Sequence, residues 1–238
     1  AADATVSVGG IGGIDVTVID PTFLYLFSPA LSPGTLNDVS VTNPGSAPVT
    51  ATHPNAFFAD FLDVPQTDPF HDFVEKIFRA GITAGCGGGS YCPDSAVTRA
   101  QMAAFLLRAE HGASYLPPPC TGAFGDVSCP SLFADWIEQL AREGITAGCG
   151  GGNYCPSNPV TRAQMAVFLL KAEHGTGYAP PACQGVFGDV SCPSLFADWI
   201  EQFSAEGITS GCGGGNYCPG NPNTRGQMAV FLTKTFHL

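Results

Sequence analysis

Apolar residues recur with the period of an α-helix through the last three quarters of the chain. Phe133, Trp136, Ile137 and Leu140 fall on one helical face, and Gly144 follows as a helix-stop signal. The same pattern occurs one step of 63 residues earlier and one step later. The two equivalent faces are Phe70, Phe73, Val74 and Ile77, ended by Gly81, and Phe196, Trp199, Ile200 and Phe203, ended by Gly207.

A second helix is predicted after each of these. Thr161 with Gln164 three residues later has the spacing of a capping box, in which the two residues satisfy otherwise unpaired backbone amides at a helix start. Met165, Phe168 and Leu169 then form an apolar stripe that favours a place in the core. The other two copies carry Thr98, Gln101, Met102, Phe105 and Leu106, and Thr224, Gln227, Met228, Phe231 and Leu232.

These patterns are parts of one repeat. Cys86, Cys149 and Cys212 are 63 residues apart, and three copies fill residues 57–238. Each copy is interpreted as an Asp-bearing opening, a first helix, a glycine loop and a second helix, which together form a helical hairpin. One hairpin cannot bury its apolar face alone, so neighbouring copies are expected to supply the rest of the core.

The N-terminal residues follow a different pattern. Alternating or β-rich runs separated by Gly and Pro turns predict four or five strands, at residues 5–8, 14–18, 22–27 and 37–42 among others. The stretch from Ser28 to Pro44 resembles the end of an immunoglobulin-like IPT/TIG domain, whose earlier strands have no counterpart before Ala4. The resemblance implies a partial β-sandwich.

Composition narrows the function classes. The 238 residues include nine basic and twenty acidic side chains, and this net charge of −11 argues against nucleic acid or an anionic membrane surface as partner. No apolar run approaches the roughly 20 residues of a membrane-spanning helix, so membrane insertion is not expected. A start at Ala1, without Met or a signal-like segment, is interpreted as a mature, processed product.

Ten cysteines are placed so that they pair locally. Three pairs enclose three glycines each, and two further pairs occur only in the second and third copies. Phe57 and Gln66 stand at the first copy's equivalent positions, so both members of that pair are absent together, as a bonded pair predicts. Zinc is the rival interpretation, but these spacings differ from those of zinc sites. Five disulfides point to an oxidising, extracellular setting. The predicted pairs are Cys86–Cys92, Cys120–Cys129, Cys149–Cys155, Cys183–Cys192 and Cys212–Cys218.

The complete repeat resembles the S-layer homology (SLH) domain. The motifs that carry the resemblance are Phe-x-Asp-Val, Gly-Ile-Thr-x-Gly and Thr-Arg-Ala-Gln before an apolar helix. It implies three SLH-like repeats packed as a pseudo-threefold prism and a non-catalytic role in attachment to cell-wall polysaccharide. The expected fold class is therefore α+β and disulfide-rich, with a partial β-sandwich before the repeats. The expected domains are residues 1–56, 57–119, 120–182 and 183–238.

In that family the Arg of a Thr-Arg-Ala-Glu motif lines the glycan groove. The matching residues here are Arg99, Arg162 and Arg225, although Gln replaces Glu in every copy and Gly226 replaces Ala in the third. Nearby opening aspartates and helix tryptophans complete the expected glycan or anion site. These residues are Asp63, Asp126, Asp189, Trp136 and Trp199.

The arginines also attract attention on physical grounds. Each stands in the first turn of a helix, where a cation opposes the helix dipole, so an anion is expected to compensate it. One candidate is the opening Asp of the same copy, in a structural ion pair. The other is an acidic glycan held by the helix N-terminus and the guanidinium together. The three arginines are expected to differ in exposure, because copies at the chain ends have unequal neighbours.

Other ionisable residues recur with the same step. His111, His174 and His237 are interpreted either as histidines favoured by a helix C-terminus or as a threefold metal cluster. Acidic residues on the first helix are expected to form its solvated face. No catalytic motif is present, so we expect neither an enzyme nor a cofactor. The acidic residues are Asp72, Asp135, Asp198, Glu75, Glu138 and Glu201.

The sequence thus predicts a secreted structural protein of the cell surface, with cell-wall polysaccharide as a partner. The open β module is expected to be completed by a neighbouring subunit, which gives a head-to-tail homopolymer. The alternative is an anchor fragment of a larger secreted protein or hydrolase, without self-assembly. The side chains expected at the assembly face are Phe23, Leu24, Tyr25, Leu26 and Phe27.

Overall fold

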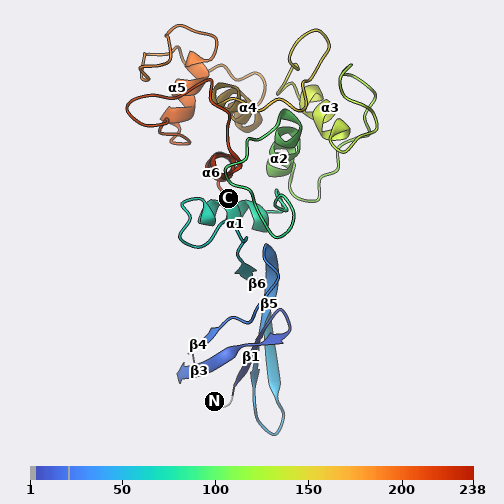
Figure 1. Cartoon of the computed structure of the whole chain (residues 1–238), viewed down its shortest axis with the longest axis vertical. Helices are drawn as coiled ribbons and strands as arrows, with labels where there is room; N and C mark the ends of the chain where they lie inside the picture. The colour runs from blue at the N-terminus through green and yellow to red at the C-terminus, as the bar shows by residue number, and fades with distance from the viewer. Residues whose placement is uncertain (1–3, 21) are drawn as a thin grey trace. The chain divides into compact units, whose positions relative to one another are not determined.

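A computed structural model describes residues 4–20 and 22–238, and these form two compact units (Figure 1). The first, which we call the β unit, contains the residues up to Asp68 together with Ala84–Tyr91. The second, the helical unit, contains Pro69–Thr83 and Cys92–Leu238. The glycine loop of the first copy therefore belongs to the β unit, whereas the helices of all three copies belong to the helical unit.

The β unit contains two antiparallel sheets. The larger has the order β2-β1-β5-β6 and the smaller pairs β3 with β4. The four predicted runs are confirmed as strands. The long last strand was not predicted, because it holds Pro54 and its residues up to Ala56 are all exposed, so no alternation marks it. The strands are β1 (Thr5–Val8), β2 (Ile11–Gly12), β3 (Ile14–Asp20), β4 (Phe23–Phe27), β5 (Thr35–Asn43) and β6 (Val49–Ala59).

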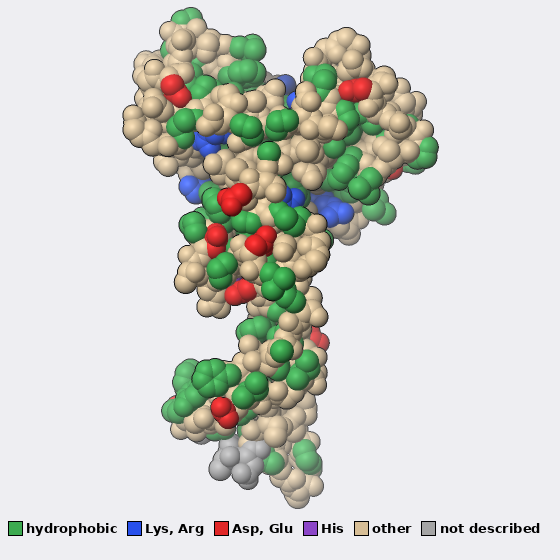
Figure 2. All heavy atoms as spheres, viewed as in Figure 1, with side chains coloured by type: hydrophobic (Ala, Val, Ile, Leu, Met, Phe, Trp, Pro, Cys, Tyr) green, Lys and Arg blue, Asp and Glu red, His purple; other side chains and the backbone are tan. Residues whose placement is uncertain are grey.

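One face of the β3–β4 hairpin is bare. Along β4 the side chains alternate, with Leu24 and Leu26 half-buried and Phe23, Tyr25 and Phe27 exposed. Figure 2 shows hydrophobic side chains gathered over these two strands. The five residues predicted for assembly therefore divide between an inner and an outer face, as the period of a strand requires.

Six helices lie in the described part of the chain. The predicted capping boxes are confirmed in all three copies, and the Met, Phe and Leu residues of the second helices are buried. The helices are α1 (His71–Arg79), α2 (Arg99–His111), α3 (Ala134–Arg142), α4 (Arg162–His174), α5 (Ala197–Ala205) and α6 (Arg225–Thr235).

The helices pack mainly between copies. α3 lies against α2, α5 against α4 and α1 against α6, so each first helix packs on the second helix of the preceding copy. The expectation of a hairpin packed within each copy was therefore wrong. Gly226, which replaces the Ala of the other two copies, allows α1 to pack closely on α6. A Cβ at this position would lie only 2.5 Å from the Phe70 ring at the start of α1.

Backbone hydrogen bonds close these contacts into a ring. The amide of Val97 donates to the carbonyl of Asn223, that of Asn223 to Val160, and that of Val160 to Val97, over distances of 2.8–2.9 Å. The three residues occupy equivalent positions, one in each copy. The three copies are thereby linked in a closed cycle in which the last copy bonds to the first.

Disulfides form as the cysteine spacing predicted. The pairs Cys120–Cys129, Cys149–Cys155, Cys183–Cys192 and Cys212–Cys218 are present, and Cys86 and Cys92 are also disulfide-bonded. Disulfide sulfurs are not thiolates, which the zinc interpretation of these residues requires. The enclosed glycines, such as Gly150–Gly152, have φ between 61° and 103°, a region that favours residues without a Cβ.

The cyclic packing is testable through Ile77, which is completely buried in α1. We expect Ile77→Ala to lower the free energy of unfolding by about 2–5 kcal/mol, because it leaves a cavity in the core. Backbone amides of α6 should lose more protection from hydrogen exchange than those of α2. Leu132→Ala, at a highly exposed leucine, is the control and should change neither quantity. Loss of protection in α2 with α6 unchanged would contradict the observed packing.

Candidate functional site

The three repeated arginines lie where one copy meets the next. Arg99, the first residue of α2, donates from Nε to the carbonyl of Tyr154 over 2.7 Å and from Nη2 to the hydroxyl of Thr146 over 3.3 Å. The Tyr154 hydroxyl donates in return to the carbonyl of Arg99 over 2.8 Å. Arg162 makes the equivalent bonds to Tyr217 and Thr209.

Arg225 extends this pattern around the ring, because its Nη2 donates to Thr83 of the first copy over 3.5 Å. Each of the three arginines is only 4% exposed. The expectation that they differ in exposure was therefore wrong. That expectation assumed that the copies at the chain ends lack a neighbour. In the closed cycle every arginine is buried against the next copy.

Aromatic rings enclose the guanidinium groups. Arg99 lies over the ring of Tyr154 at 4.7 Å and that of Phe168 at 5.7 Å, and both rings belong to the second copy. Arg162 and Arg225 approach Phe231 and Phe105 in the same way. Such stacking stabilises a cation that has lost most of its water. Burial lowers the pKa of Arg162, which is consistent with this loss of water.

The opening aspartates hold the glycine loops. Asp126 accepts hydrogen bonds from the amides of Tyr154 and Cys155, both at 2.7 Å, and the Tyr154 bond is the main cause of its lowered pKa. Arg99, in the preceding copy, lowers this pKa further. Arg99 thus acts on the Asp of the following copy, whereas one of the two candidates was an ion pair with Asp63 of its own copy. Asp63 accepts from the amide of Tyr91, and Asp189 from that of Tyr217.

The N-termini of the three second helices, α2, α4 and α6, have no amides to offer an anion. In α2 the amide of Arg99 donates to the carbonyl of Asn158 and that of Ala100 to Pro156, both in the following copy, while Thr98 caps the third. The same pattern holds for α4 and α6. Because these donors are already used, a glycan held by helix N-terminus and guanidinium together is not supported.

A surface cavity of about 250 Å³ opens beside Arg162. Arg162 donates from Nη2 also to the carbonyl of Gly211 over 3.1 Å, while its Nη1 makes no hydrogen bond to any residue that the structure describes. All three copies contribute to the wall. The lining residues are Phe70, Arg162, Ile208, Thr209, Ser210, Gly211, Gln227, Val230, Phe231 and Lys234.

The tryptophans lie elsewhere. Trp136 contacts Arg108 at 5.1 Å and the ring of Tyr115 at 6.2 Å, and it is not among the rings that stack on Arg99. Trp199 contacts Tyr178 in the same way. The structure thus brings Arg99 near Asp126 and Arg162 near Asp189. The tryptophans contact Arg108, Tyr115 and Tyr178 instead.

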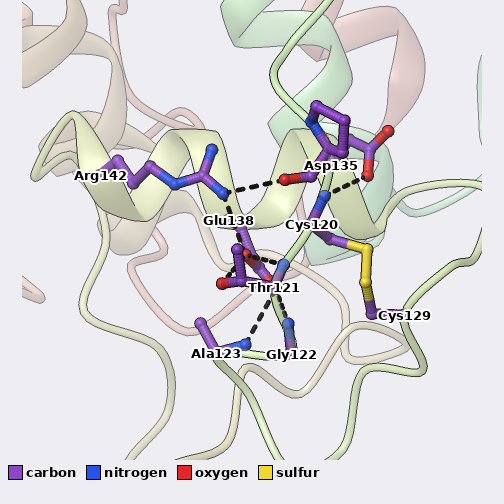
Figure 3. The surroundings of a disulfide bond; sticks show 9 residues. Cys120, Thr121, Gly122, Ala123, Cys129, Asp135, Glu138 and Arg142 are labelled. Carbon is purple, nitrogen blue, oxygen red and sulfur yellow. Dashed lines mark hydrogen bonds and ion pairs between the residues drawn. A yellow bond between two sulfur atoms is a disulfide. The ribbon is translucent and has the colours of Figure 1, made fainter.

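Sequence reasoning missed the role of an acidic residue on each of two first helices. Glu138 was expected on a solvated face, but its side chain is only 3% exposed. Its carboxylate accepts hydrogen bonds from the amides of Thr121, Gly122 and Ala123 at 2.7–2.9 Å, as Figure 3 shows. Glu201 holds the segment that follows Cys183 in the third copy in the same manner.

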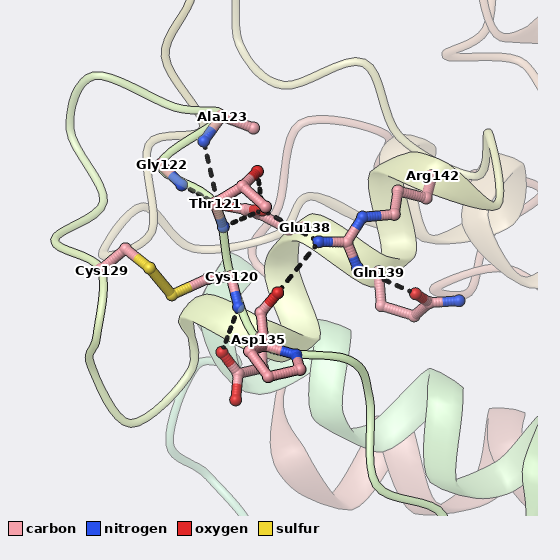
Figure 4. Close-up of polar contacts among 10 residues, drawn as sticks. Cys120, Thr121, Gly122, Ala123, Cys129, Asp135, Glu138, Gln139 and Arg142 are labelled. Carbon is pink, nitrogen blue, oxygen red and sulfur yellow. Dashed lines mark hydrogen bonds and ion pairs between the residues drawn. A yellow bond between two sulfur atoms is a disulfide. The ribbon is translucent and has the colours of Figure 1, made fainter.

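The surroundings of Glu138 fix its charge. Burial alone would raise the pKa of Glu138, but the hydrogen bonds from Ala123, Thr121 and Gly122 lower it to about 2. Arg142 also donates to this carboxylate over 3.1 Å (Figure 4). The disulfide of Cys120 and the neighbouring bond from the Cys120 amide to Asp135 fasten the same segment. The only sequence signal was the recurrence of Glu with the 63-residue step, which Glu75 shares without the same role.

Parts of this chain are similar to known cell-surface proteins. Residues 60–103 and 128–166 match the S-layer homology domain. The chain is 30% identical over 170 residues to a surface layer protein of Brevibacillus choshinensis, and 28% identical over 162 residues to a middle cell wall protein of Brevibacillus brevis. It is also 27% identical over 167 residues to an amylopullulanase of Thermoanaerobacterium thermosulfurigenes.

The aligned segments cover 67–69% of this chain but only 14%, 14% and 9% of these three relatives. The chain thus spans about one seventh of the length of the first two. The S-layer homology match and the surface-protein relatives indicate a secreted protein of the cell surface. They support a non-catalytic role for the matched segments. None of the helices that the structure describes is long and apolar enough to cross a bilayer.

The Glu138 site makes acid stability testable. Its folded-state pKa lies below the value of about 4.3 in an unfolded chain, so its stabilisation is present above that value and is lost as the pH falls towards 2. We expect Glu138→Gln to lower the free energy of unfolding at neutral pH by about 1–3 kcal/mol and to reduce its fall between about pH 4.5 and pH 2. Urea unfolding at several pH values measures both.

The matched control is Glu75→Gln, at the equivalent position of the first copy. Glu75 pairs with Arg79 and its side chain is 28% exposed, so we expect a loss of at most about 1 kcal/mol. Equal losses in the two variants would contradict the assignment of a special role to Glu138.

Proposed function

We propose that the helical unit is an attachment module that holds cell-wall polysaccharide at the junctions between its copies. The observation that carries the proposal is the cavity beside Arg162, which is built from all three copies. In this proposal the chain has three SLH-like repeats, at residues 57–119, 120–182 and 183–238, in a pseudo-threefold arrangement. Residues 1–56 form a partial IPT/TIG-like β module.

The chemistry of the cavity suits an acidic sugar. Arg162 keeps its Nη1 donors, and Lys234 adds a second cation whose Nζ donates to the carbonyl of Gly207 over 2.8 Å. Phe70 and Phe231 supply apolar surface for the C–H face of a sugar ring. A volume of about 250 Å³ is below the range typical of drug-sized ligands. We therefore infer that the cavity takes one charged sugar unit, with the rest of the polymer outside.

The relatives are consistent with attachment rather than catalysis. Similar segments occur in proteins named as surface layer proteins and in an amylopullulanase, and in each case the aligned part is a small share of the relative. A segment shared by proteins of such different names is more simply explained as an anchor than as their catalytic part. The same observation favours the alternative of an anchor fragment within a larger secreted protein.

Self-assembly through the β unit is a second candidate function. The exposed side chains of Phe23, Tyr25 and Phe27, which are 58%, 49% and 65% exposed, form an apolar face with Ile14. Large apolar faces in water favour association. A second copy of this chain docked on that face, by its repeats or by an added strand, would bury these rings and produce a head-to-tail polymer.

Attachment is tested at Lys234, which lines the cavity but takes no part in the backbone bonds that close the cycle of three copies. We expect Lys234→Ala to weaken binding to purified acidic cell-wall polysaccharide by roughly 3- to 30-fold, a loss equivalent to one exposed or half-buried charged contact, while the melting temperature changes little. Lys76→Ala removes one positive charge from α1, outside the cavity, and serves as control. Equal binding by both variants would show that this cavity does not hold the polymer.

Assembly is tested by replacing Phe23, Tyr25 and Phe27 together with serine. If this face mediates association, sedimentation velocity should show polymers for the native chain and folded monomers for the triple variant. Val49→Ser, at an exposed apolar residue of β6, is the control and should leave association unchanged. Polymers of the same length in the triple variant would refute assembly through this face.

A further inference from the structure

Two of the junctions between copies carry a cluster of ionisable side chains that neither the arginine sites nor the disulfides involve. The first joins His111 and Glu110, at the end of α2, to Glu143, which follows α3. The second joins His174 and Glu173, at the end of α4, to Glu206, which follows α5. Every member of the second cluster lies 63 residues after its counterpart in the first.

In each cluster an imidazole nitrogen and a carboxylate oxygen of the next copy are close enough to bind one ion. His111 Nε2 lies 3.0 Å from Glu143 Oε1, and His174 Nε2 lies 2.9 Å from Glu206 Oε1. In the second cluster the same imidazole nitrogen is also 3.8 Å from Glu173 Oε2. Ligand atoms about 2.0 Å from a tetrahedral zinc ion are about 3.3 Å apart, so these spacings are close to those a bound ion requires.

Each cluster also has an unsatisfied carboxylate oxygen. Glu143 Oε2 in the first and Glu173 Oε2 in the second are shielded from solvent and have no hydrogen-bond donor among the described residues. A buried carboxylate oxygen without a partner is costly, and a second carboxylate nearby adds repulsion. Burial, followed by the neighbouring charge of Glu206, raises the pKa of Glu173, and burial followed by Glu143 does the same for Glu110.

Surrounding side chains hold the imidazole and the carboxylate in place. Tyr115 stacks on His111 and Tyr178 on His174, with ring centres 4.3 and 4.4 Å apart. The amide groups of Gln139 and Gln202 donate to Glu143 and Glu206 over 2.6 Å. Residues that orient metal ligands in this manner are usual around metal sites in proteins. The histidine side chains remain 32% exposed, which gives an ion access from solvent.

The third junction supplies an internal comparison. The positions equivalent to the two glutamates are Phe236 and Ala80, so both carboxylates are absent together while His237 remains. Lys76 stands in place of the glutamine and donates to the carbonyl of Leu238. The charge of His237 offsets part of the rise in the pKa of Glu173, so His237 belongs to the surroundings of the second cluster. If the two glutamates bind one ion together, losing one removes the reason to keep the other, so we expect both to be absent from the same junction.

We propose that the His111 and His174 clusters are two binding sites for a divalent transition-metal ion of the zinc type. One imidazole nitrogen and two carboxylates form a mixed set of ligands that suits zinc, whereas calcium and magnesium prefer sites made of oxygen alone. Each ion bridges the second helix of one copy and the first helix of the next. Metal binding therefore stabilises the helical unit independently of any polysaccharide.

The test uses the full chain, freed of metal with a chelator and then equilibrated with zinc. We expect two zinc ions per chain at micromolar free zinc and a rise in melting temperature with zinc concentration. Glu143→Gln and Glu206→Gln should each leave one ion, and the double variant none. His53→Ala, at an exposed histidine of β6, is the control and should keep both ions. A stoichiometry that does not fall by one in each single variant overturns the proposal.

A second measurement covers the case in which a variant fails to fold. In the native chain, zinc should shift the imidazole NMR signals of His111 and His174 but leave that of His53 unchanged. Gln139→Ala should weaken the first site by about 10- to 100-fold, because it removes an orienting contact without removing a ligand. Unshifted His111 and His174 signals, or complete displacement of zinc by excess calcium, would refute the assignment.

Discussion

The helical unit depends on one constraint, namely that no second helix can complete its own N-terminus. In each copy the first two amides of this helix donate to carbonyls of the following copy, and the arginine side chain spans the same boundary. Unpaired amides and a buried guanidinium without acceptors would both be costly. Each copy thus requires a successor, and only a closed cycle gives the last copy one. The bonds from Arg225 to Ser95 and from Val97 to Asn223, which join the third copy to the first, provide this closure.

Much of the fold was predictable because it is encoded locally. Helix starts follow from Thr and Gln at fixed spacing, and the disulfides follow from cysteines a few residues apart. The partners of Arg99 and Glu138 were not predictable, because they lie 47–55 and 15–17 residues away across long loops. Glu138 was expected to be exposed to solvent, but its side chain is buried. An acidic residue on a helix face usually indicates solvent, and nothing in the sequence shows that a loop returns to cover it.

The first copy shows why its cysteine pair is absent. Residues 120–123 of the second copy are held by the Cys120–Cys129 disulfide and by the Glu138 carboxylate. The equivalent residues of the first copy are 57–60. There Phe57, Phe58 and Ala59 pair with β5 as the end of β6, so backbone hydrogen bonds of a sheet hold the segment instead. In the first copy, sheet hydrogen bonds thus hold the segment that a disulfide holds in the second copy.

Arg162 connects the folding of the helical unit to the function proposed for it. Its Nε and Nη2 hold the following copy, while the remaining Nη1 faces no described partner beside a cavity to which every copy contributes. A ligand in that cavity therefore meets a site that exists only while the ring is closed. By mass action such a ligand must also stabilise the ring, because it binds the closed form and not the open one. Attachment to a polymer and resistance to unfolding are then linked through one side chain.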